Sequence, residues 1–110
     1  MLLKHLVLFQ FKADTGADAV NEATSRMLGL KEGCVNATSG KQYIRSLTGG
    51  KDNSIEGAQR DLTHAFVAEF ESIEDRNYYV NEDPWHAEFK SWVVPFLENF
   101  VIVDYSEGVF

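Results

Sequence analysis

Runs of apolar residues along the chain mark four segments that we expect to form strands. The clearest is residues 63–71, where alternate positions place on one face His64, Phe66, Ala68 and Phe70. Residues 6–11 and 100–105 are apolar at successive positions, which is typical of strands that are buried on both faces. A weaker apolar pattern predicts the remaining strand over residues 38–47.

Apolar residues at helical spacing predict a first helix over residues 17–29, after a capping signal formed by Thr15 and Asp18. The residues that recur at this spacing are Val20, Ala23, Met27 and Leu30. Ser72 opens a second, short helix that runs through Tyr79, because a serine followed three residues later by an acidic residue is typical of a helix start.

A third helix is predicted to begin at Asp83 and Pro84. Aspartate is a favoured N-terminal cap, and a proline in the first turn lacks only an N–H group that would have no partner there. The residues that then share one face, at spacings of three and four, are His86, Phe89, Val93 and Phe96. We expect Pro95 to bend this helix near its end.

The predicted elements follow in the order strand, helix, strand, loop, strand, two helices, strand. This order indicates an α+β protein with a ferredoxin-like fold, in which helices cover one face of a four-stranded antiparallel sheet. Residues 48–61 are rich in glycine and polar residues, so we expect a long loop that serves as a lid or an interface arm. Because two strands are apolar on both faces, we expect the sheet of a second copy to cover the other face in a homodimer.

The length and net charge of the chain limit the number of domains and the kinds of partner that we expect. The 110 residues predict one domain over residues 1–110. Seventeen acidic residues against ten basic ones give a net charge of −7, which argues against binding nucleic acid or an anionic membrane surface. No apolar stretch approaches the roughly 20 residues of a membrane helix, and no signal peptide is recognisable, so we expect a cytoplasmic protein. The single cysteine, Cys34, excludes an internal disulfide.

His86 has the most informative position of the titratable residues. It lies in the first turn of a predicted helix, on the same face as Phe89, and both the helix start and the apolar neighbours disfavour a charged imidazolium. A neutral imidazole of this kind can accept a proton near pH 7. The same position also suits a core histidine with one satisfied hydrogen bond, and the sequence leaves both interpretations open.

The other histidines and two tyrosines are further candidates. His5 and His64 each begin a predicted strand, so neighbouring strands would bring both imidazoles into one apolar space. Tyr78 and Tyr79 precede His86 by eight and seven residues, and a tyrosine hydroxyl can position a histidine or a substrate carbonyl. The histidines lie far apart in the sequence and form no close ligand pair, so we expect no metal site.

Four segments together resemble the stress-responsive A/B barrel family. They are KHLVLFQFK at residues 4–12, THAFVAEFES at 63–72, YVNEDPWHAEF at 79–89 and VIVDY at 101–105, in the family's order. The resemblance is carried mainly by a Pro-x-His-x-x-Phe element after a tyrosine, together with the histidine of the opening strand. The chain departs from the family's common His-Pro-Ala-His sequence at Asp83 and Trp85.

This resemblance implies a dimeric α/β barrel and an apolar pocket that works without a cofactor. One plant member, olivetolic acid cyclase, closes a linear polyketide by aldol condensation. Similarity to it assigns the general base to His86 and a supporting hydroxyl to Tyr79 or its neighbour Tyr78. The residues implied around the pocket are His5, His64, Tyr78 and Phe89, with Asp104 near His86. The family also includes non-catalytic stress-related oligomers, and a cofactor-free monooxygenase or hydrophobic-ligand binder on the same fold is a third possibility.

Overall fold

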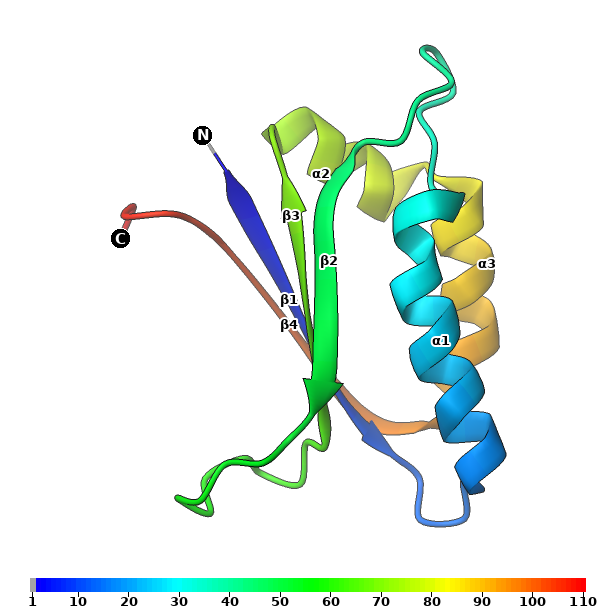
Figure 1. The fold of residues 1–110 in the computed structure, drawn as a ribbon, viewed down its shortest axis with the longest axis vertical. Coiled ribbons are helices and arrows are strands. Elements are labelled where there is room, and N and C mark those ends of the chain that lie inside the picture. Colours follow the sequence, from blue (N-terminus) through cyan, green and yellow to red (C-terminus); the bar gives the residue numbers. More distant parts are fainter. Residues whose placement is uncertain (1) are drawn as a thin grey trace.

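The computed structural model describes residues 2–110 and shows a four-stranded antiparallel sheet with three helices on one face (Figure 1). The elements are β1 (Leu3–Phe11), α1 (Ala17–Gly33), β2 (Ile44–Lys51), β3 (His64–Phe70), α2 (Ile73–Asn81), α3 (Pro84–Val93), a short 3-10 helix (Val94–Phe96) and β4 (Leu97–Ser106). The strand order is β2-β3-β1-β4, and each neighbouring pair is antiparallel. The predicted ferredoxin-like α+β fold is therefore confirmed.

Strand β1 lies in the middle of the sheet, and its alternate residues face the helices. Val7 pairs with Phe66 of β3 and with Ile102 of β4, so these three side chains point to the same side. The helix-facing residues of β1 are all buried: Leu3, His5, Val7 and Phe9. Together with Met27 of α1 and Phe89 of α3 they form much of the core.

Helix α1 continues four residues beyond the predicted end at residue 29. Gly29 is exposed, and a Cβ there would meet nothing within 4 Å, so this glycine has no reason to end the helix. The helix ends at Gly33, after which the backbone N–H of Cys34 donates to the carbonyl of Leu30. A Cβ on Gly33 would lie 2.1 Å from Nε1 of Trp85, so this glycine lets the Trp85 side chain of α3 lie against the end of α1.

The start of α1 also differs from the prediction. Gly16 occupies the N-cap position, and no side chain caps the free backbone N–H groups. The hydroxyl of Thr15 instead donates to the carbonyl of Phe96, at 3.2 Å. The predicted cap by Thr15 is therefore wrong, because this hydroxyl ties the β1–α1 connection to the segment that leads into β4.

Strand β2 lies further along the chain than predicted, over Ile44–Lys51 instead of residues 38–47. The polar loop predicted over residues 48–61 therefore begins only after the strand. The second half of the strand was missed because it contains two glycines, which are typical of loops. Gly49 lies opposite Phe66, and a Cβ on Gly49 would lie 2.2 Å from Cδ1 of the Phe66 ring. A glycine is needed here because the aromatic ring lies directly over the backbone of β2.

The helices that follow β3 begin at the predicted side-chain caps. Oγ of Ser72 accepts a hydrogen bond from the backbone N–H of Asp75 at 3.1 Å. Oδ1 of Asp83 accepts one from the backbone N–H of Trp85 at 2.9 Å. Pro95 lies in the 3-10 helix after α3, where the α-helical hydrogen bonding has ended. These caps fix where α2 and α3 begin, and the candidate site lies at the junction between the two helices.

The face of the sheet away from the helices keeps apolar side chains in contact with solvent. The apolar residues that point to this side include Leu6, Leu8, Val67, Val103 and Tyr105. Val103 and Tyr105 are about half-exposed, and an ion pair between Lys4 and Glu69 lies on the same face. All three helices lie on the opposite side (Figure 1), so one copy of the chain leaves much of this apolar surface open.

Candidate functional site

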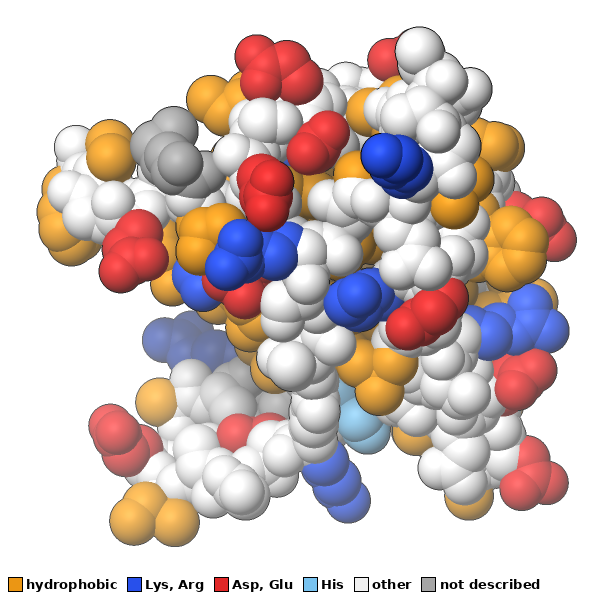
Figure 2. Space-filling view, turned by 45° about the horizontal axis from the view of Figure 1, so that its top comes forward, with side chains coloured by type: hydrophobic (Ala, Val, Ile, Leu, Met, Phe, Trp, Pro, Cys, Tyr) orange, Lys and Arg blue, Asp and Glu red, His pale blue; other side chains and the backbone are white. Residues whose placement is uncertain are grey.

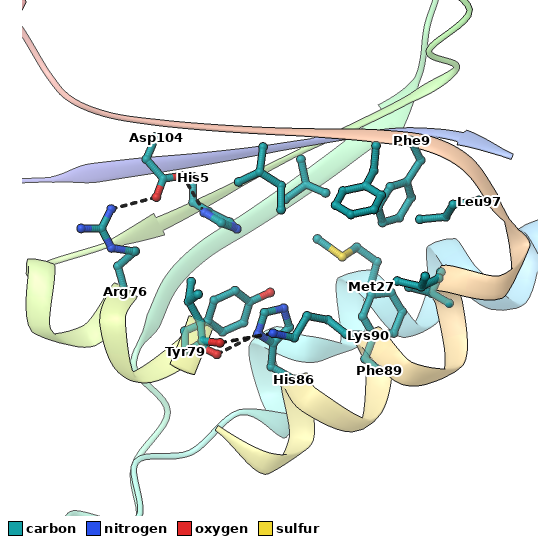
Figure 3. A pocket seen from close by; sticks show the side chains of 16 residues that line it. His5, Phe9, Met27, Arg76, Tyr79, His86, Phe89, Lys90, Leu97 and Asp104 are labelled. Carbon is teal, nitrogen blue, oxygen red and sulfur yellow. Dashed lines mark hydrogen bonds and ion pairs between the residues drawn. The ribbon is translucent and has the colours of Figure 1, made fainter. Parts of the chain in front are cut away.

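A cavity of about 380 Å³ lies between the sheet and helices α2 and α3 (Figure 3). Its volume falls within the roughly 300–1,000 Å³ that is usual for small-molecule sites. One end is apolar and is lined by Phe9, Met27, Phe89 and Leu97. The other end carries the polar side chains of His5, Arg76, Tyr79, His86, Lys90 and Asp104. This division suits a ligand that has an apolar part and a polar part.

The cavity opens along the edge strand β4. Phe100 and Ile102 of this strand line the cavity, yet they are 48% and 52% exposed. They point toward the helix side of the sheet, because Phe100 pairs with Phe9 and Ile102 with Val7. The helices do not extend over them, so a small molecule can reach the polar and apolar ends past an apolar rim.

His86 enters the cavity from the first turn of α3, and its ring is held by the end of α2. Nδ1 of His86 lies 2.7 Å from the backbone carbonyl oxygen of Tyr79. A carbonyl only accepts, so Nδ1 carries the proton and Nε2 of the neutral ring keeps its lone pair. The ring also stacks on the Tyr79 ring, with centroids 3.7 Å apart and planes 11° from parallel. Both contacts fix the direction of the imidazole.

The surroundings of His86 favour its neutral form. Burial lowers its pKa from 6.5 to about 4, since the charged ring would lose most of its hydration. The hydrogen bond to the Tyr79 carbonyl acts in the opposite direction but is outweighed, and the positive charge of Lys90 adds to the decrease. His86 is therefore an imidazole that is free to accept a proton at neutral pH.

Tyr79, and not Tyr78, lies at the cavity. Its buried ring stacks on His86 and meets His5 edge-on, with 5.6 Å between the ring centroids. Burial raises the pKa of the Tyr79 phenol, so the hydroxyl keeps its proton and can act as a hydrogen-bond donor. Tyr78 packs against Tyr43 instead and does not line the cavity. Successive side chains on α2 point in different directions, which brings Tyr79 to the cavity and turns Tyr78 away from it.

His5 reaches the cavity from β1 and is held by β4. Its Nδ1 lies 2.6 Å from Oδ1 of Asp104, and Oδ2 of the same carboxylate accepts from Nη1 of Arg76 at 2.8 Å (Figure 3). The carboxylate accepts from Nδ1–H and so fixes the direction of the His5 ring. Asp104, which we expected near His86, is therefore bonded to His5, because the end of β4 pairs with the start of β1.

A buried cluster anchors the start of α3. The carboxylate of Asp83 caps the backbone N–H groups of Trp85 and His86 through Oδ1, and its Oδ2 accepts a hydrogen bond from the hydroxyl of Tyr43. Cys34 lies in the same cluster, where burial raises the pKa of its thiol to about 12. The cluster holds the backbone of His86 in place and keeps the Cys34 thiol protonated and unreactive.

His64 does not share the cavity with His5. Strands β1 and β3 are antiparallel, so their first residues lie at opposite ends of the sheet, and His64 pairs with Phe9. Its ring packs edge-on against Phe11, with centroids 5.2 Å apart, and its Nδ1 lies 2.8 Å from Oγ1 of Thr63. Burial lowers the pKa of His64 as well. The expectation of one apolar space for both histidines is therefore wrong, and the remaining predicted pocket residue, Phe89, does line the cavity.

Arg76 and Lys90 line the polar end but were missed in the sequence. The available signal was helical spacing, because residues three or four apart on a helix share one face. Arg76 precedes Tyr79 by three residues, and Lys90 follows His86 by four. Each charged residue therefore lies beside a residue that the sequence analysis had already singled out.

Other kinds of site find little support. Among residues 2–110, no three His, Cys, Asp or Glu side chains lie close enough together to hold a metal ion. In the described part of the chain, no helix combines the length and apolar character needed to cross a bilayer. Acidic and basic side chains are interspersed over the face drawn in Figure 2, which is unlike the basic face of a nucleic-acid-binding protein.

Comparison with known sequences identifies relatives along almost the entire chain. The family model described as the stress-responsive A/B barrel domain matches residues 3–107. The chain is also similar to the stress-response A/B barrel domain-containing protein HS1 of Arabidopsis thaliana. The two are 29% identical over 104 residues, which cover 94% of this chain and 88% of that protein.

Solved structures share the fold at lower identity. A hydroxynitrile lyase from Passiflora edulis is 19% identical, with a TM-score of 0.84 over 99% of this chain and 96% of the lyase. A dimeric ferredoxin-like protein from Jannaschia sp. CCS1 is 18% identical, with a TM-score of 0.76 over 96% and 99% of the two chains. At these identities the likeness concerns the arrangement of strands and helices.

Proposed function

Because this chain belongs to the stress-responsive A/B barrel domain family, we propose that it is a cofactor-independent enzyme of the cyclase or lyase type. Its substrates are small apolar carbonyl compounds, such as a linear poly-β-ketone, and His86 is the general base. The observation that carries this proposal is the hydrogen bond from Nδ1 of His86 to the Tyr79 carbonyl, which leaves a neutral Nε2 with its lone pair at an apolar cavity.

The reaction is an aldol-type cyclisation. Nε2 of His86 removes a proton from the carbon between two carbonyl groups, and the electron pair of that C–H bond moves into an enolate. The enolate carbon attacks a second carbonyl carbon of the same molecule, so a C–C bond forms and the carbonyl π pair moves onto oxygen. This oxygen then takes the proton from the His86 imidazolium, which restores the neutral ring.

The surroundings of His86 and Tyr79 support the return of the proton and the binding of a substrate oxygen. An imidazolium with a pKa of about 4 returns its proton readily to an alkoxide. The protonated hydroxyl of Tyr79 serves as a hydrogen-bond donor to a substrate oxygen. Lyase chemistry uses the same steps in reverse, since cleavage of a hydroxyl-bearing carbon begins with loss of the hydroxyl proton to a base. The hydroxynitrile lyase with a similar fold is consistent with this class of reaction.

The test compares two histidines of the same chain. His86→Gln should lower the turnover of a linear poly-β-ketone by about 10²–10⁴-fold, the usual effect of losing a general base. His64→Gln, at the opposite end of the sheet, should leave turnover unchanged, and Tyr79→Phe should cost less than His86→Gln because it removes only a donor. If the parent protein shows no turnover and His86→Gln merely lowers the melting temperature, the histidine is a structural residue of a non-catalytic oligomer.

We also infer that the chain forms a homodimer through the helix-free face of the sheet. Apolar residues on that face, among them Val103 and Tyr105, stay about half-exposed in one copy, and sheets pack face to face about 10 Å apart. The dimeric ferredoxin-like protein from Jannaschia has the same fold. Light scattering should give twice 12.4 kDa. Val103→Glu should shift the mass to that of one chain, whereas Ile55→Glu, in the exposed β2–β3 loop, should not.

A further inference from the structure

We propose that the cavity selects small apolar molecules that carry a carboxylate, and that the side chain of Lys90 provides this selectivity. The proposal rests on the proposed function, because it names the substrate class of the same cavity. It concerns the charge of the ligand, which the general base alone does not determine.

The polar end of the cavity carries an excess of positive charge. Arg76 and Lys90 are cationic, and among the described residues Asp104 is the single acidic one that lines the cavity. The Asp104 carboxylate is already occupied, since it accepts hydrogen bonds from His5 and Arg76. The whole chain, in contrast, has a net charge of −7. A cationic end inside an otherwise acidic protein favours an anionic group of the ligand at that place.

Lys90 is the cation that remains available to a ligand. Among residues 2–110, its ammonium group forms no ion pair, whereas Arg76 is bound to Asp104. Its one hydrogen bond joins Nζ to the backbone carbonyl of Val80 at 3.2 Å. A lysine ammonium has three N–H donors, so two of them can still bind a carboxylate.

The end of helix α2 fixes the position of this ammonium group. Its last carbonyl groups have no partner within the helix, and two of them are taken by side chains of α3. The Tyr79 carbonyl accepts from His86 and the Val80 carbonyl accepts from Lys90. The same short segment therefore holds the base and the ammonium group beside each other at the polar end of the cavity (Figure 3).

The geometry gives a simple orientation of the ligand. Its apolar part lies against Phe9, Met27 and Phe89, and its carboxylate lies toward Lys90 at the opening. The part of the molecule between these two ends then passes His86. An alcohol of the same length would fill the apolar end equally well but would lack the charge that Lys90 recognises.

The experiment compares octanoate with 1-octanol by titration calorimetry at about pH 8, where the acid is ionised. Octanoate should bind the parent protein about fivefold more tightly than 1-octanol, the size expected of a solvent-exposed ion pair. Lys90→Gln should abolish this preference while leaving the affinity for 1-octanol within twofold. Lys90→Arg should keep the preference. Lys41→Gln, which removes an equal charge from an exposed site away from the cavity, should change neither affinity.

Three results would overturn the proposal. One is equal affinity of the parent for the two ligands, which leaves the cavity a ligand site and the proposed function intact. Another is a Lys90→Gln variant that lowers both affinities and the melting temperature together, which makes Lys90 a purely structural partner of Val80. Binding of neither ligand would remove both this proposal and the proposed function.

Discussion

Two imidazoles reach the same cavity from opposite walls, and their partners differ. His86 on α3 donates from Nδ1 to a neutral backbone carbonyl, that of Tyr79. His5 on β1 donates from Nδ1 to the carboxylate of Asp104, which is also bound to Arg76. Burial does not distinguish them, because His5 is 3% and His86 8% exposed. The difference lies in the charge of the group that accepts from Nδ1.

The difference assigns the two rings to different tasks. A proton that arrives at Nε2 of His86 is disfavoured by burial, which outweighs the attraction of the nearby Asp83 carboxylate, so the ring gives it back easily. The ring of His5 is instead held in a fixed direction by the Asp104 carboxylate. We therefore propose that His86 transfers the proton and that His5 holds a polar group of the ligand.

The pH dependence of stability tests the His86 side of this comparison and has the largest expected effect. Between pH 6.5 and about 4 the unfolded chain binds a proton at His86 that the folded chain does not bind, so the free energy of unfolding decreases as the pH falls through this window. The full decrease from this group is about 3 kcal/mol and is complete below about pH 4. Urea unfolding at a series of pH values measures it.

The control removes each ring in turn. His86→Gln should lose this part of the acid sensitivity, while carboxylates elsewhere continue to contribute theirs. His5→Gln should keep it. Equal acid sensitivity of the parent and His86→Gln would show that the folded protein tolerates a charged His86, and the contrast between the two imidazoles would then disappear.

The support of His5 is tested by Asp104→Ala. This substitution leaves both the His5 N–H and the Arg76 guanidinium without their acceptor in a partly buried site, and we expect a loss of about 1–3 kcal/mol in the free energy of unfolding. Glu71→Ala is the matched control, because Glu71 pairs with Arg45 on the exposed surface and should contribute less than about 1 kcal/mol. Similar losses for the two variants would mean that Asp104 acts only as a surface charge.

Much of the fold was predictable because local chemistry determines it. Alternation marked β3, and the caps at Ser72 and Asp83 marked the starts of α2 and α3 within one residue. Strand β2 was misplaced for a physical reason. Gly49 reads as a loop residue in the sequence, yet its missing Cβ makes room for the Phe66 ring of the neighbouring strand. A glycine that serves a contact between distant residues carries no local sign of it.

The sequence indicated most of the residues of the candidate site, but it did not indicate which of them contact each other. The cap at the α2–α3 junction brings His86 and Tyr79 together. The hydrogen bond between them, however, is accepted by a backbone carbonyl, and because every residue has one, the sequence does not mark this contact. The placement of His64 and Asp104 depends on strand direction. Antiparallel pairing puts the start of β3 far from the start of β1. It puts the end of β4 beside the start of β1. Applied to the predicted topology, that rule would have separated His64 from His5.

The cap that positions His86 provides the last and smallest test of the comparison. The hydroxyl of Tyr43 donates to Asp83, whose other oxygen receives the backbone N–H groups at the start of α3. Tyr43→Phe removes one hydrogen bond to a buried carboxylate and should lower the free energy of unfolding by about 1–2 kcal/mol. Tyr78→Phe is the control, since its ring packs on Tyr43 in the same region and no hydrogen bond of its hydroxyl lies among the described contacts.

Activity separates positioning from stability in the same variants. If the cap holds the His86 ring against Tyr79, Tyr43→Phe should reduce kcat for a poly-β-ketone at temperatures well below its melting transition, because small displacements of a base are costly. The ring of His5 is held by β4 and not by this cap, so its contribution to ligand affinity should persist and KM should change little. A rise in KM with an unchanged kcat would show that the cap supports ligand binding and does not position the base.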